Sequence, residues 1–137
     1  MFVVRVSKSQ KQPYAILFVM IYIISSITYL ATILSLSVFV FDPTHLYYEL
    51  PWLDIPMHVL GGFGVVCLVF SIARYLKKSI SFKVVIFSYL IVAIGWELYE
   101  LVHDIIRQTE WNDVTDTVAD VINGALGGLV AYFFFKK

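Results

Sequence analysis

The residues of this sequence best suited to chemistry are carboxylates and histidines placed within apolar stretches. The segment GWELYELVHD (residues 95–104) holds Glu97, Glu100, His103 and Asp104 close to the end of a long apolar run. Ionisable groups inside a membrane segment are costly, and they usually mark a function or a specific partner. Several carboxylate oxygens with one imidazole suit Mg²⁺, Mn²⁺ or Ca²⁺, so the chemistry indicated is that of a divalent-metal site.

Two further apolar stretches carry polar residues at helical spacing. Residues three and four positions apart share one face of a helix. Asp54 and His58 therefore lie together at the start of one predicted helix. In the last stretch, DVTDTVADVINGALGG, the same spacing predicts a single polar stripe of Asp113, Asp116, Asp120, Asn123 and Gly127.

These polar groups extend inward from the ends of the predicted helices. At 1.5 Å per residue, Asp120 lies about 6 Å inward from Asp116. By the same measure, Glu97 lies about 10 Å inward from Asp104. Glu97, Asp120 and His58 are therefore predicted to meet at one level below the outer surface. The predicted metal ligands are His58, Glu97, Glu100 and Asp120, with Asp54, His103, Asp104, Asp116 and Asn123 as further candidates.

Three interpretations of this cluster remain open. Several carboxylates at one level cannot all ionise without compensation, so either protons or a cation must neutralise them. The cluster is then a structural network of protonated, hydrogen-bonded groups, a metal site acting on a lipid or cell-envelope precursor, or an ion or proton pathway. All the acids lie toward the same ends of the predicted helices as the cluster, and the half of the membrane beyond the cluster holds none. This weakens the pathway interpretation.

Four apolar stretches must position these groups. The chain has 137 residues, of which 60% are hydrophobic and 15% are charged, and this is too apolar for an ordinary soluble domain. A bilayer core of about 30 Å is crossed by a helix of about 20 apolar residues. We predict an all-α integral membrane four-helix bundle formed by residues 14–137, after a basic N-terminus of residues 1–13. The predicted spans are residues 14–41, 56–76, 82–103 and 117–135.

The first span and the connection after it carry polar and aromatic residues with simpler interpretations. Because polar stripes facing lipid are disfavoured, the hydroxyl stripe of the first span is expected to turn inward. Tyr47, Tyr48 and Trp52 are expected to lie in an interfacial aromatic belt, and Asp54 to cap the second helix. The hydroxyl stripe consists of Ser25, Thr28, Thr32 and Ser35.

The basic residues predict the orientation of the bundle. Nine of the ten Lys and Arg residues precede the first span, surround the second connection or end the chain, and only Arg107 does not. By the positive-inside rule both termini are cytoplasmic, so every carboxylate and histidine falls on the outer side. We expect a multi-pass protein of the plasma (inner) membrane whose polar site faces outward. The basic residues are too few and too scattered for a nucleic-acid partner.

Three segments, LDIPMHVLGG, GWELYE and DTVADVINGALGG, together resemble the VanZ-like and YjdF-like families of small bacterial polytopic membrane proteins. Those families show an Asp four residues before a His, a helix that bears Glu, and a final Asp-rich segment that runs into small residues. The resemblance covers residues 52–132, and for the VanZ-like members it implies a role in the cell envelope without a particular reaction. The matching positions are Asp54, His58, Glu97, Glu100, Asp116, Thr117 and Asp120.

The predicted orientation can be tested by cysteine labelling. Cysteines placed at Leu46 and Thr109 should react with a membrane-impermeant thiol reagent outside intact cells, because both positions lie in predicted outer connections. A cysteine at Ser79 should react only after the cells are opened. Labelling at Ser79 from outside would overturn the orientation.

Overall fold

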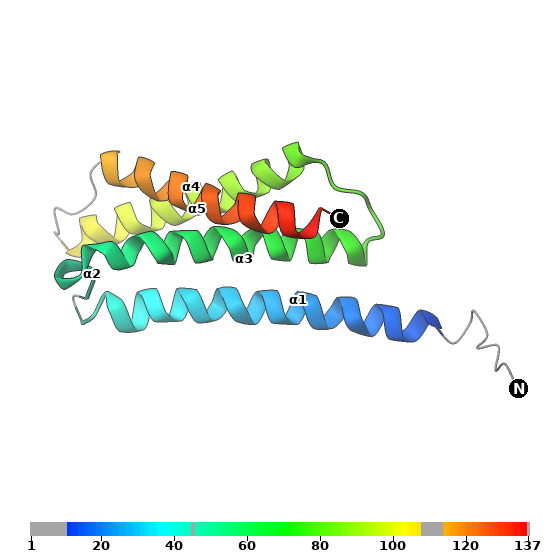
Figure 1. The fold of residues 1–137 in the computed structure, drawn as a ribbon. Helices are drawn as coiled ribbons and strands as arrows, with labels where there is room; N and C mark the ends of the chain where they lie inside the picture. The colour runs from blue at the N-terminus through cyan, green and yellow to red at the C-terminus, as the bar shows by residue number, and fades with distance from the viewer. Residues whose placement is uncertain (1–10, 45, 108–113, 137) are drawn as a thin grey trace, which may run out of the picture.

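Four long helices make up most of the structure, a computed structural model that describes residues 11–44, 46–107 and 114–136 (Figure 1). Each of the four is long and apolar enough to cross a membrane, so the predicted all-α architecture with four spans is confirmed. They are α1 (Lys11–Leu36), α3 (Asp54–Tyr75), α4 (Phe82–Arg107) and α5 (Val114–Phe135). Positions 1–10, Thr109 and Asp113 lie outside the described residues.

The helix ends differ from the predicted spans because helical hydrogen bonding continues beyond the apolar region. The helix α4 runs on to Arg107 instead of residue 103, and α5 begins at Val114 instead of residue 117. Between α1 and α3 the chain forms three short turns of helix. They are the π-helical turn η2 (Ser37–Phe41), α2 (Leu46–Glu49) and the 3₁₀ turn η3 (Pro51–Leu53).

The helix α3 is central to the bundle. It packs against α1 on one side and most extensively against α5 on the other, while α4 contacts both α3 and α5 (Figure 1). In the half of the bundle near the C-terminus, an apolar core joins α3, α4 and α5. Its buried members are Val66, Phe70, Val85, Ala131 and Tyr132.

The contact between α3 and α5 is close enough that the two backbones touch. A Cβ atom at Gly62 would collide with the carbonyl group of Gly124, and one at Gly127 would collide with the carbonyl oxygen of Val59. Small residues permit this approach in membrane helices, where van der Waals packing is a main source of helix association. The glycines therefore determine both the distance and the register between α3 and α5.

The hydroxyl stripe of α1 does not face the bundle. Ser25, Thr28, Thr32 and Ser35 are all exposed, so the expectation that they turn inward is wrong. A hydroxyl can be satisfied by the backbone of its own helix, as where Thr32 donates to the carbonyl oxygen of Thr28 at 2.9 Å. Such bonding removes part of the cost of facing lipid. The polar link from α1 to α3 is instead Tyr29, whose hydroxyl donates to the carbonyl oxygen of Leu60 at 3.2 Å.

Alanine substitutions should distinguish the glycines that set this packing from those that do not. Gly62→Ala and Gly127→Ala should each destabilise the bundle by about 1–3 kcal/mol, because a backbone cannot move aside as a side chain can. Gly61→Ala and Gly95→Ala are matched controls, since a Cβ at either position meets nothing within 4 Å. Thermal unfolding in mild detergent provides the measurement. Equal unfolding temperatures for all four variants would contradict this view of the α3–α5 contact.

Candidate metal centre

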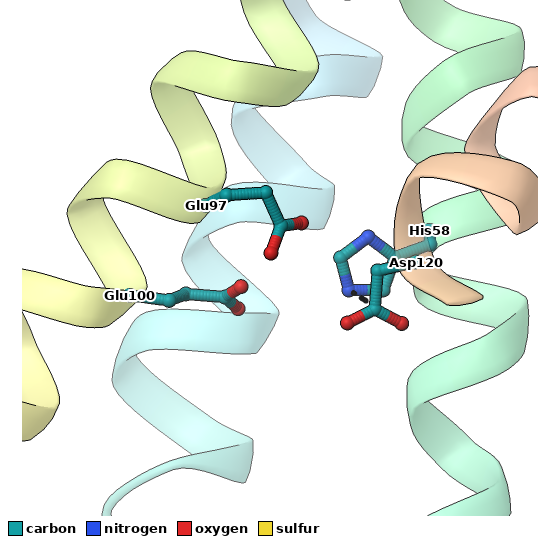
Figure 2. Close-up of side chains that lie close together, drawn as sticks. All are labelled: His58, Glu97, Glu100 and Asp120. Carbon is teal, nitrogen blue, oxygen red and sulfur yellow. Dashed lines mark ion pairs between the residues drawn. The ribbon is translucent and has the colours of Figure 1, made fainter. Parts of the chain in front are cut away.

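Three helices bring four potential ligands together near one end of the bundle. His58 comes from α3, Glu97 and Glu100 from α4, and Asp120 from α5 (Figure 2). Each side chain offers one ligand atom, and these four atoms lie within 4.8 Å of one another. The structure thus gathers the four residues that the sequence singled out as metal ligands. That they bind an ion stays a prediction.

The imidazole of His58 is the electrostatic centre of the group. Its Nε2 atom lies 3.3 Å from Asp54 Oδ1 and 3.5 Å from Asp120 Oδ1. The expectation that Asp54 caps its helix is wrong, since Leu53 occupies the N-cap position and no side chain caps there. Asp54 instead lies one helical turn before His58 on the same face. This i,i+4 contact with His58, made within the same helix, takes the place of a capping bond.

Asp120 also belongs to a second group of acids. Asp54, Asp116 and Asp120 each offer an oxygen atom, and these three atoms lie within 4.8 Å of one another. Asp120 is buried whereas Asp116 is exposed, so the group leads from the N-terminal end of α5 toward the four-residue cluster. Two of the further candidates, Asp54 and Asp116, are therefore neighbours of the cluster.

The other candidate ligands lie elsewhere. His103 Nε2 is 3.5 Å from Asp42 Oδ2, and its ring stacks on Tyr99 with centroids 5.8 Å apart. Neither His103 nor Asp104 belongs to the two ligand groups found among the described residues. Asn123 is half-buried, three positions inward from Asp120 on α5. His103 and Asp104 follow Glu100 by three and four positions, so helical spacing alone could not decide whether either of them joins Glu100 in the cluster.

The cluster is well shielded from solvent. Glu97 is 9% exposed and Asp120 is 5% exposed. The ion pairs of Asp54 and Asp120 in the described residues are both made with His58. One imidazole can offset at most one unit of negative charge, and four carboxyl groups surround it. The remaining charge has to be removed by protons or by a bound cation.

The sequence predicts Tyr47 in the aromatic belt, and it gives no sign of the side-chain hydrogen bond that Tyr47 makes. Its hydroxyl donates to Ser37 Oγ at 2.8 Å, and the side chain is half-buried. Burial, with a smaller contribution from the nearby carboxylates of Asp54 and Glu100, raises the pKa of Tyr47 to about 12, so the hydroxyl keeps its proton. Trp52 is 61% exposed, and its place in an aromatic belt stays a prediction.

Four membrane-length helices with a carboxylate and histidine group among three of them define a multi-pass membrane protein with an intramembrane polar site. A family model described as "Predicted membrane protein (DUF2238)" matches residues 12–137, and the chain belongs to this family. Comparison with curated proteins found no match, and comparison with solved structures found none. The family match supplies no link to the VanZ-like or YjdF-like families, so that resemblance rests on the motifs alone.

A double-mutant cycle should detect the contact between α3 and α5 within the cluster. The effects of His58→Ala and Asp120→Ala on the free energy of unfolding should be non-additive by about 0.5–3 kcal/mol, the range for residues in contact. His58→Ala combined with Asp42→Ala should be additive, because Asp42 pairs with His103. Additivity in the first cycle would show that the two side chains do not interact.

Proposed function

We propose that the protein holds a divalent cation at His58, Glu97, Glu100 and Asp120, and uses it to act on a lipid or cell-envelope component at the outer side of the plasma membrane. The observation that carries this proposal is the approach of four ligand atoms from three helices to within 4.8 Å of one another. Three carboxylates with one imidazole suit Mg²⁺, Mn²⁺ or Ca²⁺. With both termini in the cytoplasm, as the basic residues predict, these ligands face outward.

A divalent cation supplies the charge compensation that the cluster needs. Its two positive charges would offset carboxylates that otherwise lie together in a medium of low dielectric constant. Mg²⁺ usually keeps several positions for water or for substrate oxygens when it is bound by protein carboxylates. A bound cation of this kind polarises a phosphoryl or carbonyl oxygen as a Lewis acid. The headgroup of a lipid or of a lipid-linked precursor presents such oxygens at this depth.

A purely structural network is less well supported by the packing. Gly62 and Gly127 already bring α3 and α5 into backbone contact, so the bundle does not depend on the polar groups for its closest interface. Burying several acids costs stability unless they are fully paired. Their presence therefore favours a role beyond packing.

A pathway across the membrane is also less well supported. An ion or proton that left the cluster toward the opposite side would need further polar groups along α3 and α5. The region below is instead the apolar core that includes Val66, Phe70 and Tyr132. This core favours a site reached from the outer side only.

Conservative amide substitutions should separate the metal site from a protonated network. Mn²⁺ should raise the unfolding temperature of the wild-type protein, because an ion that binds only the folded state stabilises it by about 2.7 kcal/mol at one hundred times its dissociation constant. Glu97→Gln and Asp120→Asn should reduce this stabilisation, since each removes a charged ligand and nearly keeps its shape. Glu49→Gln, at an exposed acid of α2, should leave it unchanged.

The same experiment can refute the proposal. If the carboxyl groups are protonated and structural, Mn²⁺, Mg²⁺ and Ca²⁺ will all leave the unfolding temperature of the wild-type protein unchanged. The amide variants will then be as stable as the wild type or more stable, because they remove the cost of keeping a buried acid neutral.

A further inference from the structure

Basic side chains gather at the end of the bundle opposite the four-residue cluster. This end holds the connection between α3 and α4 and the end of α5 (Figure 1). The acids of the described residues lie toward the other end, and each of the three ion pairs found among these residues involves a histidine. The basic side chains therefore have no acid partner within the described part of the chain. They are the exposed Arg74, Lys77, Lys78, Lys83 and Lys136.

Two of these cations are held over aromatic rings. The guanidinium carbon of Arg74 lies 5.6 Å from the centroid of the Phe135 ring. Lys136 Nζ lies 5.3 Å from the centroid of the Tyr132 ring. Such contacts favour a fixed position of the cation and leave most of its N–H groups available to oxygen acceptors. Arg74 and Lys136 are thus positioned without having their hydrogen-bonding capacity used up.

The two rings belong to one aromatic group that joins three helices. Both pack against Phe70, whose ring centroid is 5.9 Å from that of Tyr132 and 6.1 Å from that of Phe135. The ring of Phe82, the first residue of α4, lies 4.8 Å from that of Tyr132, and Lys83 is the next residue. The basic residues of α3, α4 and α5 are therefore gathered around a single aromatic group.

The connection between α3 and α4 adds two lysines at the same place. Lys77 takes the left-handed backbone conformation, with a φ of 52°, and so ends the helix. The backbone N–H groups of Lys77 and Lys78 donate to the carbonyl oxygens of Arg74 and Ala73 at 3.1 and 2.9 Å. Ile80, which follows, packs against the apolar core. These contacts keep both lysines next to the last turn of α3.

Exposed apolar side chains directly adjoin the basic residues. Tyr75 and Leu76 follow Arg74, Phe134 precedes Lys136 by two positions, and all three apolar side chains are more than half exposed. A free phosphate ion would use only the cations of such a surface. A phospholipid would use the cations through its headgroup and the apolar side chains through its acyl chains. The combination therefore favours a lipid.

We infer that this end of the bundle binds the headgroup of an anionic phospholipid, chiefly through Arg74 and Lys136. The phosphate oxygens accept hydrogen bonds from the guanidinium and ammonium groups, and the acyl chains lie along the adjoining apolar residues. Basic groups between helix ends at the membrane surface bind anionic headgroups in this way, and arginine also offers a planar pair of donors that matches a phosphate group. The site is separate from the proposed metal centre, so neither proposal depends on the other.

Native mass spectrometry of the protein in mild detergent tests this inference. The probes are phosphatidylglycerol, which is anionic, and phosphatidylcholine with the same acyl chains, which is zwitterionic. The wild type should bind phosphatidylglycerol more tightly. Arg74→Gln and Lys136→Gln should each weaken that binding about fivefold, the factor expected for one basic residue near an anionic headgroup. Arg107→Gln, which removes the same charge at the last residue of α4, is the matched control and should leave the binding unchanged.

Arg74→Lys distinguishes a defined site from general attraction by charge. It keeps the positive charge but loses the planar donors, so it should weaken phosphatidylglycerol binding about twofold or more, as for one lost hydrogen bond. Equal binding of the two lipids, wild-type affinity in Arg74→Lys, or equal losses in Arg74→Gln and Arg107→Gln would overturn the inference. Displacement of the lipid by an equal concentration of inorganic phosphate would show that the site binds a free anion, and would also overturn it.

Discussion

The backbone contact between α3 and α5 is the constraint on which the rest of the structure depends. Gly62 meets Gly124, and one turn closer to the N-terminal ends of the same two helices His58 meets Asp120. Both pairs have the same offset, since 124 − 62 and 120 − 58 both equal 62. A side chain at Gly62 would separate the helices, and the cluster would then lose the shared position of its histidine and its most buried aspartate.

Around this contact, the bundle concentrates its polar groups at one level. The helix α4 contributes Glu97 and Glu100, which share a face because they are three positions apart. Toward the C-terminal ends of α3 and α5 the packing becomes apolar, and toward the start of α3 Asp54 lies one turn before His58. A group of acids within a membrane span is costly unless something neutralises it, and this cost is the physical reason for proposing a cation at the cluster.

The sequence predicted the spans and the faces of the helices well, because apolar length and helical periodicity are local properties of the chain. These properties were enough to bring His58, Glu97, Glu100 and Asp120 together. Helical spacing also predicted the contact of Asp54 with His58, but it could not show that Asp54 approaches Asp120 on another helix instead of capping its own. Nor could these properties place residues whose partners depend on how a helix is rotated or how a connection folds. Those residues are Ser25, Thr28, Thr32, Ser35, Asp42, Tyr47 and His103.

The most direct measurement of the central claim is the metal content of the wild-type protein, purified in mild detergent and analysed by elemental mass spectrometry after dialysis against a low concentration of Mn²⁺. A cation that neutralises the cluster should be retained in a fixed stoichiometric ratio to the chain. The variant that carries both Glu97→Gln and Asp120→Asn should retain much less. A wild-type protein that is fully folded and holds no more metal than this double variant would contradict the claim that a cation compensates these carboxylates.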